Sequence, residues 1–125
     1  MPDTTKFKNN KYFVGRYTEP NEYRSWFVGA FMNKNHPCQT DKVEVLYREC
    51  PVGFIQKPHY HEEKLEILIV IEGKAKYFVN DNEVVLEKGD YLFVAANNVV
   101  SGEVLELCKM FTIHAPSLPK DRIFT

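Results

Sequence analysis

GFIQKPHYHEEKLEILIVIEG, residues 53–73, is the most informative stretch of the chain. Pro58 disfavours helix in the residue before it, and the apolar run after residue 64 consists of strand formers, so we expect two extended segments joined by a turn. Residues two apart in a strand point to the same face, which places the imidazoles of His59 and His61 side by side. Glu66 can add a carboxylate from the second segment. Two histidines and one carboxylate are typical ligands of a divalent metal with open coordination positions.

The charge of Glu66 supports this interpretation, although an isolated His-x-His pair is more often a surface or hydrogen-bonded pair. Glu66 begins an apolar strand, and an uncompensated buried charge costs several kcal/mol. A metal ion held together with the two histidines would compensate the carboxylate. An ion pair with Lys64 or Arg48 would do the same without a metal.

The spacing of this stretch resembles a known sequence motif. Gly53-x5-His59-x-His61-x4-Glu66-x6-Gly73 fits the first motif of the cupins, G-x5-H-x-H-x3,4-E-x6-G, at every specified position. The resemblance covers roughly residues 41–116. It implies an all-β protein with the cupin double-stranded β-helix, or jelly-roll, barrel and a divalent metal bound by the two histidines and the glutamate.

The second cupin motif, G-x5-P-x-G-x2-H-x3-N, begins at Gly89 and is then incomplete. Ala95 stands in place of its proline and Asn97 in place of its second glycine. Asparagine is a mild replacement because it tolerates the left-handed backbone that a turn glycine supplies. Val100 is a severe one, since it occupies the position of the family's fourth metal ligand, a histidine.

Short β-rich runs separated by Gly, Pro, Asn and Asp recur along the chain, which is typical of an antiparallel sandwich or barrel. Strands are predicted at residues 11–17, 25–32, 42–49, 54–60, 66–71, 74–79, 83–87, 91–94 and 104–114. Residues 80–82 predict a tight hairpin turn, because Asn and Asp accept positive φ. The predicted core includes Leu68, Val70, Val85, Leu92, Val94 and Phe111.

A chain of 125 residues is the length of one domain, and the resemblance implies that this is a single cupin domain over residues 1–125. Within it we expect N-terminal strands and a dimer arm at residues 1–40, a cupin core at 41–116 and a C-terminal tail at 117–125. The N-terminal part is rich in aromatic residues, which either pack on the core or cover a partner subunit. We expect a homodimer with aromatic residues at or beside the interface, chosen from Tyr12, Phe13, Trp26 and Phe27.

Composition argues against several classes of partner. Sixteen Lys and Arg residues against seventeen Asp and Glu residues give a net charge of −1, so neither a basic patch for nucleic acid nor a charged tail is indicated. The three cysteines are odd in number and lack a C-x-x-C pair, which favours free thiols in a reducing compartment. No secretion signal or membrane span is indicated. We expect a cytoplasmic protein that binds a small-molecule substrate or ligand, with no nucleic acid and no membrane partner.

Three functions follow from the resemblance. The first is a metal-dependent oxygenase, isomerase or lyase on a small polar substrate, with Fe(II) favoured and Mn, Ni or Zn as alternatives. The second is a metal-independent sugar-nucleotide epimerase or isomerase that uses His59 and His61 as acid and base. The valine in place of the fourth metal ligand at position 100 favours this function. The absence of an arginine beside the histidine pair disfavours it. The third is a non-catalytic ligand-binding cupin. The candidate catalytic residues are His59, His61, Tyr60, Tyr77 and Glu49, with Glu62 and His114 as further groups that could move protons. His114, on the same strand face as Thr112 and Met110, is interpreted first as a hydrogen-bonded histidine without a metal.

Overall fold

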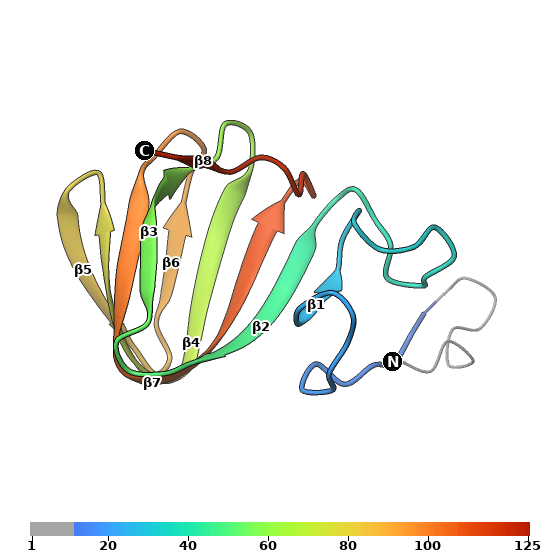
Figure 1. Cartoon of the computed structure of the whole chain (residues 1–125), viewed down its shortest axis with the longest axis horizontal. Helices are drawn as coiled ribbons and strands as arrows, with labels where there is room; N and C mark the ends of the chain where they lie inside the picture. Colours follow the sequence, from blue (N-terminus) through green and yellow to red (C-terminus); the bar gives the residue numbers. More distant parts are fainter. Residues whose placement is uncertain (1–11) are drawn as a thin grey trace.

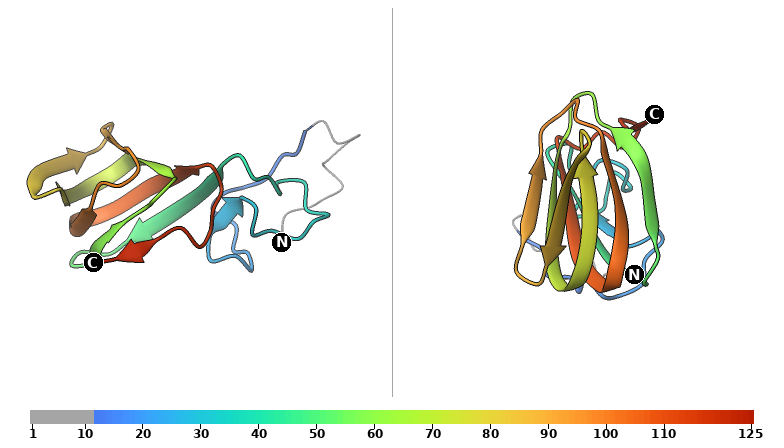
Figure 2. Two further views of the ribbon diagram at one scale, coloured as in Figure 1. Left: turned by 90° about the horizontal axis from the view of Figure 1, so that it is seen from above. Right: turned by 90° about the vertical axis from the view of Figure 1, so that its left-hand side faces the viewer.

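A computed structural model describes residues 12–125, in which all regular structure is β-strand (Figure 1). The strands are β1 (Trp26–Val28), β2 (Glu44–Cys50), β3 (Ile55–Tyr60), β4 (Leu65–Val79), β5 (Asn82–Glu87), β6 (Tyr91–Val94), β7 (Val100–Ala115) and β8 (Ile123–Phe124). Every strand pair is antiparallel. The strands surround a common interior (Figure 2). Within the described residues no helix is long and apolar enough to span a membrane.

The long strands β4 and β7 lie at the centre of the strand pairing. They pair with each other from Leu65–Ala115 to Val79–Val100, while β7 also pairs with β2 and β3, and β4 with β5 and β6. The pairing register shifts between Val70 and Ala75, where Gly73 has a φ of 94°. A Cβ on Gly73 would lie 2.0 Å from the carbonyl oxygen of Leu107, so only glycine fits this bulge. The two strands predicted at 66–71 and 74–79 are therefore one strand that continues through the bulge.

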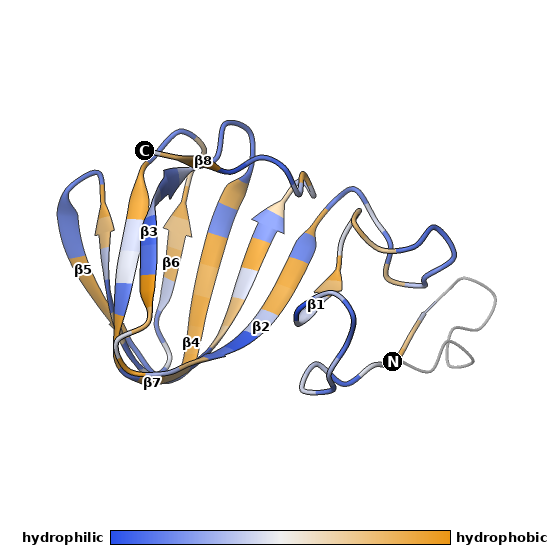
Figure 3. Cartoon of the chain, in the orientation of Figure 1, coloured by the Kyte–Doolittle hydropathy of each residue, from blue (hydrophilic) through white to orange (hydrophobic). Residues whose placement is uncertain are grey.

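Alternation along β4 directs one set of side chains into the interior. Glu66, Leu68 and Val70 are buried, whereas Ile67 and Ile69 between them are half-buried on the outer face. Figure 3 shows β4 as a largely hydrophobic band with a polar interruption near its start. The buried core cluster consists of Cys50, Leu68, Val70, Ala75, Tyr77, Leu86, Val100, Val104, Cys108 and Met110.

Two predicted core residues lie elsewhere. Val85 is 45% exposed, because Leu86 faces the interior and a neighbour in a strand must face out. Phe111 is half-buried on the outer face of β7, where its ring packs 5.3 Å from the ring of Tyr47. Leu68, Val70 and Val94 are buried as predicted, and Leu92 is partly buried against the core.

The N-terminal segment differs most from the prediction. Of the strand predicted at 11–17, residue 11 lies outside the described residues, only Tyr12 makes an isolated bridge, and residues 13–17 are not in a strand. The strand predicted at 25–32 is reduced to β1. Tyr17 instead packs its ring 4.6 Å from that of Tyr47, covering part of the outer face of β2 and β7. The predicted turn between β4 and β5 is confirmed, with φ of 48° at Asn80 and 71° at Asp81.

Candidate metal centre

The end of β3 and the start of β4 bring the three predicted ligands together. His59 lies on β3, His61 directly follows it, and Glu66 is the second residue of β4. Their side chains are 1%, 4% and 2% exposed. One ligand atom from each residue lies within 4.8 Å of those of the other two, which is close enough for a single ion between them after small side-chain adjustments.

Backbone carbonyls fix the tautomer of both histidines. Nδ1 of His59 donates to the carbonyl oxygen of Lys57 at 2.8 Å, and Nδ1 of His61 donates to that of Asp121. A carbonyl only accepts, so each Nδ1 carries the proton and each Nε2 keeps a lone pair for a ligand. Burial also lowers the pKa of His59, which favours the neutral form that coordinates a metal.

Two buried polar atoms in this group have no hydrogen-bond partner among the described residues. They are Nε2 of His61 and Oε1 of Glu66. Nε2 of His61 lies 3.6 Å from Oε2 of Glu66, too far for a normal hydrogen bond. Unpartnered buried acceptors are costly, and a cation between them would satisfy both. The donor set therefore fits a divalent metal.

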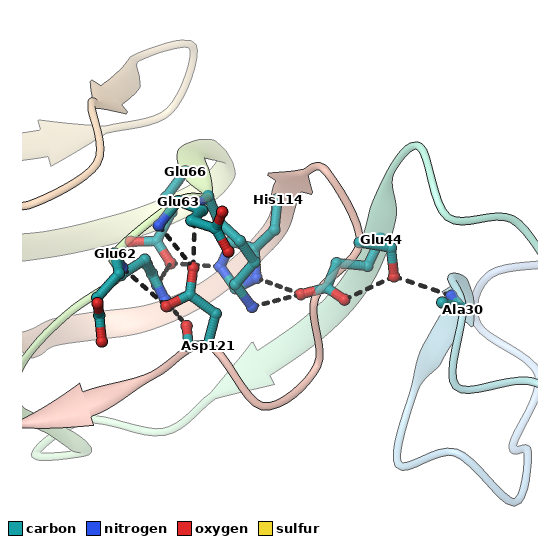
Figure 4. A network of polar contacts seen from close by, with 10 residues as sticks. Ala30, Glu44, Glu62, Glu63, Glu66, His114 and Asp121 are labelled. Atoms are coloured by element: carbon teal, nitrogen blue, oxygen red, sulfur yellow. Dashed lines mark hydrogen bonds and ion pairs between the residues drawn. The ribbon is translucent and has the colours of Figure 1, made fainter.

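His114 provides the counter-charge of Glu66. Its Nε2 donates to Oε2 of Glu66 at 2.6 Å, and its Nδ1 donates to Oε1 of Glu44 at 2.9 Å (Figure 4). The three residues form a row because His114 on β7 stands directly opposite Glu44 on β2 and Glu66 on β4. Burial alone would lower the pKa of His114, but the hydrogen bonds to the two carboxylates outweigh it and raise that pKa. Burial would raise the pKa of Glu66, but the hydrogen bond from His114 and the nearby ring of His61 lower it.

Glu44 holds a second set of charges together. Its carboxylate accepts hydrogen bonds from Lys64 at 2.6 Å and from the hydroxyl of Ser117 at 2.9 Å. Burial would raise the pKa of Glu44, yet the hydrogen bonds from His114, Lys64 and Ser117 lower it to about 2. The alternative in which Lys64 or Arg48 compensates Glu66 differs from the structure: Lys64 pairs with Glu44, and the guanidinium of Arg48 lies 5.5 Å from the ring centre of Phe54.

Asp121 ties the C-terminal segment to the turn between β3 and β4. Its carboxylate accepts backbone N–H groups of Glu62, Glu63 and Lys64 at 2.7, 2.9 and 3.0 Å (Figure 4). Burial would raise the pKa of Asp121, and these hydrogen bonds lower it. The same residue fixes the ring of His61 through its carbonyl oxygen. The segment therefore holds the turn and one candidate ligand at once.

The other candidate catalytic residues lie outside this group. Tyr60 is half-buried and alternates with the inward-facing His59 on β3. The hydroxyl of Tyr77 faces Sδ of Met110 at 3.8 Å within the core, and burial, with nearby Cys50 and Glu66, raises its pKa. Glu49 and Glu62 are exposed, and Glu49 accepts a hydrogen bond from Tyr47 at 3.2 Å.

A cavity of about 330 Å³ opens beside the group. His61 and His114 line it, but so do residues from both ends of the chain. Its full lining is Glu22, Tyr23, Arg24, Trp26, Phe31, Glu44, His61, Lys64, His114, Pro119 and Arg122. The sequence showed no arginine beside the histidine pair, whereas the fold brings two arginines to the same cavity as His61.

The chain is similar to known proteins both in sequence and in structure. Residues 47–104 match the family model described as the cupin domain. These residues form a cupin domain. An uncharacterized conserved protein with a double-stranded β-helix domain from Klebsiella pneumoniae subsp. pneumoniae MGH 78578 has a similar structure, with a TM-score of 0.67 at 19% identity over 87% of this chain and 90% of that one. A search of curated proteins gave no match.

Two further structures share the cupin fold at low sequence identity. KdgF from Halomonas sp. gives a TM-score of 0.61 at 18% identity, covering 64% of this chain and 74% of that chain. Pac13, a nucleoside dehydratase from Streptomyces, gives 0.62 at 16% identity, covering 69% and 70%. The predicted all-β cupin jelly roll is confirmed, and at these identities the likeness shows the fold alone.

Val100 occupies a defined position in this cupin domain. It stands directly opposite His59 in the pairing of β3 with β7 and is 1% exposed. Residues opposite each other share a face, so its side chain points into the interior beside the histidine. Where the cupin motif has a fourth ligand, this chain therefore has an apolar side chain packed in the core.

Proposed function

We propose that this chain is a metal-dependent enzyme acting on a small polar substrate. Nε2 of His59, Nε2 of His61 and Oε1 of Glu66 would bind one divalent ion. The observation that carries the proposal is the pair of unpartnered buried atoms on His61 and Glu66, adjacent to a histidine whose tautomer suits coordination. Two histidines and one carboxylate favour Fe(II), with Mn, Ni or Zn as alternatives.

Three protein ligands leave coordination positions for a substrate, which is typical of catalytic rather than structural sites. A bound metal would act there as a Lewis acid. The protein's own part is to keep Oε2 of Glu66 occupied by His114, so that Oε1 is directed at the ion. His114 also lines the cavity, but both of its N–H groups are donated to Glu44 and Glu66, so its role is to position Glu66. We place the protein in the cytoplasm, because Cys38, Cys50 and Cys108 are free thiols and free thiols are typical of a reducing compartment.

Metal loading tests this proposal. The purified protein is incubated separately with Fe(II), Mn(II), Ni(II) and Zn(II), passed through a desalting column and assayed for bound metal. We expect one ion per chain for the preferred metal and a marked loss in Glu66→Gln, which removes the anionic ligand. Glu72→Gln is the matched control, because Glu72 lies on the same strand but is exposed and pairs with Lys109. Equal loading of wild type and Glu66→Gln would reject the proposal.

The charge balance favours a second candidate function, metal-independent acid–base catalysis. Glu44, Lys64, Glu66 and His114 compensate one another without a metal. In this function the histidines act directly on the substrate, as in sugar-nucleotide epimerase-like cupins. A cavity that only binds a ligand is the non-catalytic alternative. Turnover that survives exhaustive chelation would favour direct acid–base catalysis, and binding without turnover would favour the non-catalytic cupin.

A further inference from the structure

The cavity beside His61 has an aromatic wall built by the N-terminal segment. The indole of Trp26 lies 5.5 Å from the ring of His114 and 6.0 Å from that of Phe31, measured between ring centres. Tyr23 extends the wall, with its ring 5.6 Å from that of Phe31. A wall of this kind offers a large apolar contact surface to a planar ring.

The charged groups around the cavity leave a positive excess. Lys64 and His114 already pair with Glu44 and Glu66. Arg24 and Arg122 are exposed and make no ion pair with a carboxylate within residues 12–125. Glu22 is the one further acid in the lining. Two planar guanidinium groups against one carboxylate favour an anionic ligand.

The loop that carries Arg24 and leads into Trp26, the first residue of β1, is held in an uncommon conformation. Arg24 and Ser25 have φ of 55° and 73°, where residues with a Cβ are rare. The side chain of Asn21 stabilises the loop: its Oδ1 accepts the N–H of Tyr23 at 2.7 Å, and its Nδ2 donates to the carbonyl oxygen of Trp26 at 3.1 Å. Strained backbone persists where surrounding contacts enforce it, often at ligand sites.

We propose that this cavity binds a small ligand that combines a planar ring with an anionic group, a carboxylate or a phosphate. The ring packs on Trp26 and Phe31, and the anion is bound by Arg24 and Arg122. Because His61 lines the cavity, we take this ligand to be the substrate of the proposed enzyme, and in this respect the inference rests on the proposed function. Ring stacking and arginine pairing do not themselves require a metal.

Fluorescence titration tests this inference, because Trp26 is the single tryptophan of the chain. Benzoate and phenyl phosphate are titrated into the full chain before and after chelation, with neutral benzamide as the isosteric control. We expect a saturable change in fluorescence for at least one anion and at least about tenfold weaker binding of benzamide, since losing a charge-assisted hydrogen bond costs about 1.5 kcal/mol or more. The better of the two anions identifies the anionic group.

Arginine variants complete the test. Arg24→Gln and Arg122→Gln together should raise the Kd of the anion about tenfold or more, whereas Lys88→Gln, in the exposed turn after β5, should leave it unchanged. Equal binding of benzamide, an unchanged Kd in the double variant, or no saturable response to either anion would overturn the inference. Anion binding by a protein that takes up no metal would uphold the inference and reject the metal proposal, so the two fail separately.

Discussion

Val100 and His59 face each other across β3 and β7, so a histidine at position 100 would stand beside the candidate metal ligands. We expect Val100→His to tighten metal binding by adding the fourth ligand of the cupin motif. It should also lower the free energy of unfolding by about 1–3 kcal/mol, because a larger side chain must enter a packed core. Calorimetric titration and urea unfolding measure the two effects. Val100→Leu is the control for volume, and equal tightening in that variant would contradict the ligand explanation.

The lowered pKa of Glu44 predicts that the metal-free protein loses stability at acid pH, which we call the acid limb of its stability profile. Its pKa is about 2 in the folded state and 4.5 for an unperturbed carboxyl group. Its contribution is therefore fully present above pH 4.5 and is lost as the pH falls toward 2, by up to about 3 kcal/mol. His114 acts in the opposite direction: its raised pKa stabilises the fold below pH 6.5, and this contribution is lost as the pH rises through the raised value.

Stability should consequently be highest between about pH 4.5 and 6.5. Urea unfolding at several pH values, after chelation, measures this profile. In Glu44→Gln the acid limb should shrink but persist, because the pKa of Glu66 is lowered as well. An acid limb of undiminished size in this variant would contradict the assignment.

At this scale the sequence predicted the three candidate ligands but not their partners. His59, His61 and Glu66 stand at fixed spacings within one short stretch, so the motif alone brings them together. Glu44 and His114 are 70 residues apart and meet only through the pairing register of β2 with β7. A shift of one residue in that register would separate them, and sequence patterns locate strand ends only to within a few residues.

The C-terminal segment, through Asp121, holds the turn between β3 and β4 and the ring of His61. We expect Asp121→Ala to weaken metal binding about 10–100-fold while the β-fold persists, because it releases the turn after β3 and loosens the hydrogen bond that orients His61. Calorimetric titration of metal, with circular dichroism for the fold, measures both.

Asp90→Ala provides a matched control. Asp90 also accepts a backbone N–H in a turn, that of Glu87 at 2.9 Å, but this turn lies between β5 and β6 and holds none of the three ligands. It should leave the metal affinity unchanged. Equal weakening in the two variants would indicate a general loss of stability and would contradict the positioning role of Asp121.

The strands of the barrel were largely predictable, because alternation and turn residues mark them. The hairpin turn at Asn80 and Asp81 is an example, since both residues adopt the positive φ that their side chains tolerate. The N-terminal strand was not predictable in the same way. Tyr12 and Tyr17 have high strand propensity, but the partner of a strand is decided by tertiary packing, and Tyr17 packs its ring on Tyr47 instead.

At the scale of the whole molecule, the homodimer remains a prediction. The outer face of β6 exposes Tyr91 and Phe93 by 71% and 53%, directly beside the half-buried Ile67 and Ile69 of β4. Strands that are apolar on both faces are usually covered on both. Phe13, Trp26 and Phe27 are half-buried and pack within their own chain. Among the predicted interface aromatics, Tyr12, 55% exposed, is therefore the one most available to a partner.

We expect the wild-type chain to be dimeric at micromolar concentration and the double variant Tyr91→Lys/Phe93→Lys to be monomeric. Light scattering coupled to gel filtration measures this. Val85→Lys, which places a charge on the half-exposed outer side of β5, is the control and should remain dimeric. A monomeric wild type would contradict the prediction.

Anomalous scattering from a crystal tests the central claim most directly, because it locates an ion without reference to activity. Crystals grown with Fe(II) or Mn(II), and measured at the absorption edge of that metal, should show one peak between His59, His61 and Glu66. We expect it about 2.0–2.2 Å from Nε2 of both histidines and from Oε1 of Glu66. Ordered side chains with no peak between them, or a peak at another place in the chain, would contradict the account and make direct acid–base catalysis by the histidines the leading explanation.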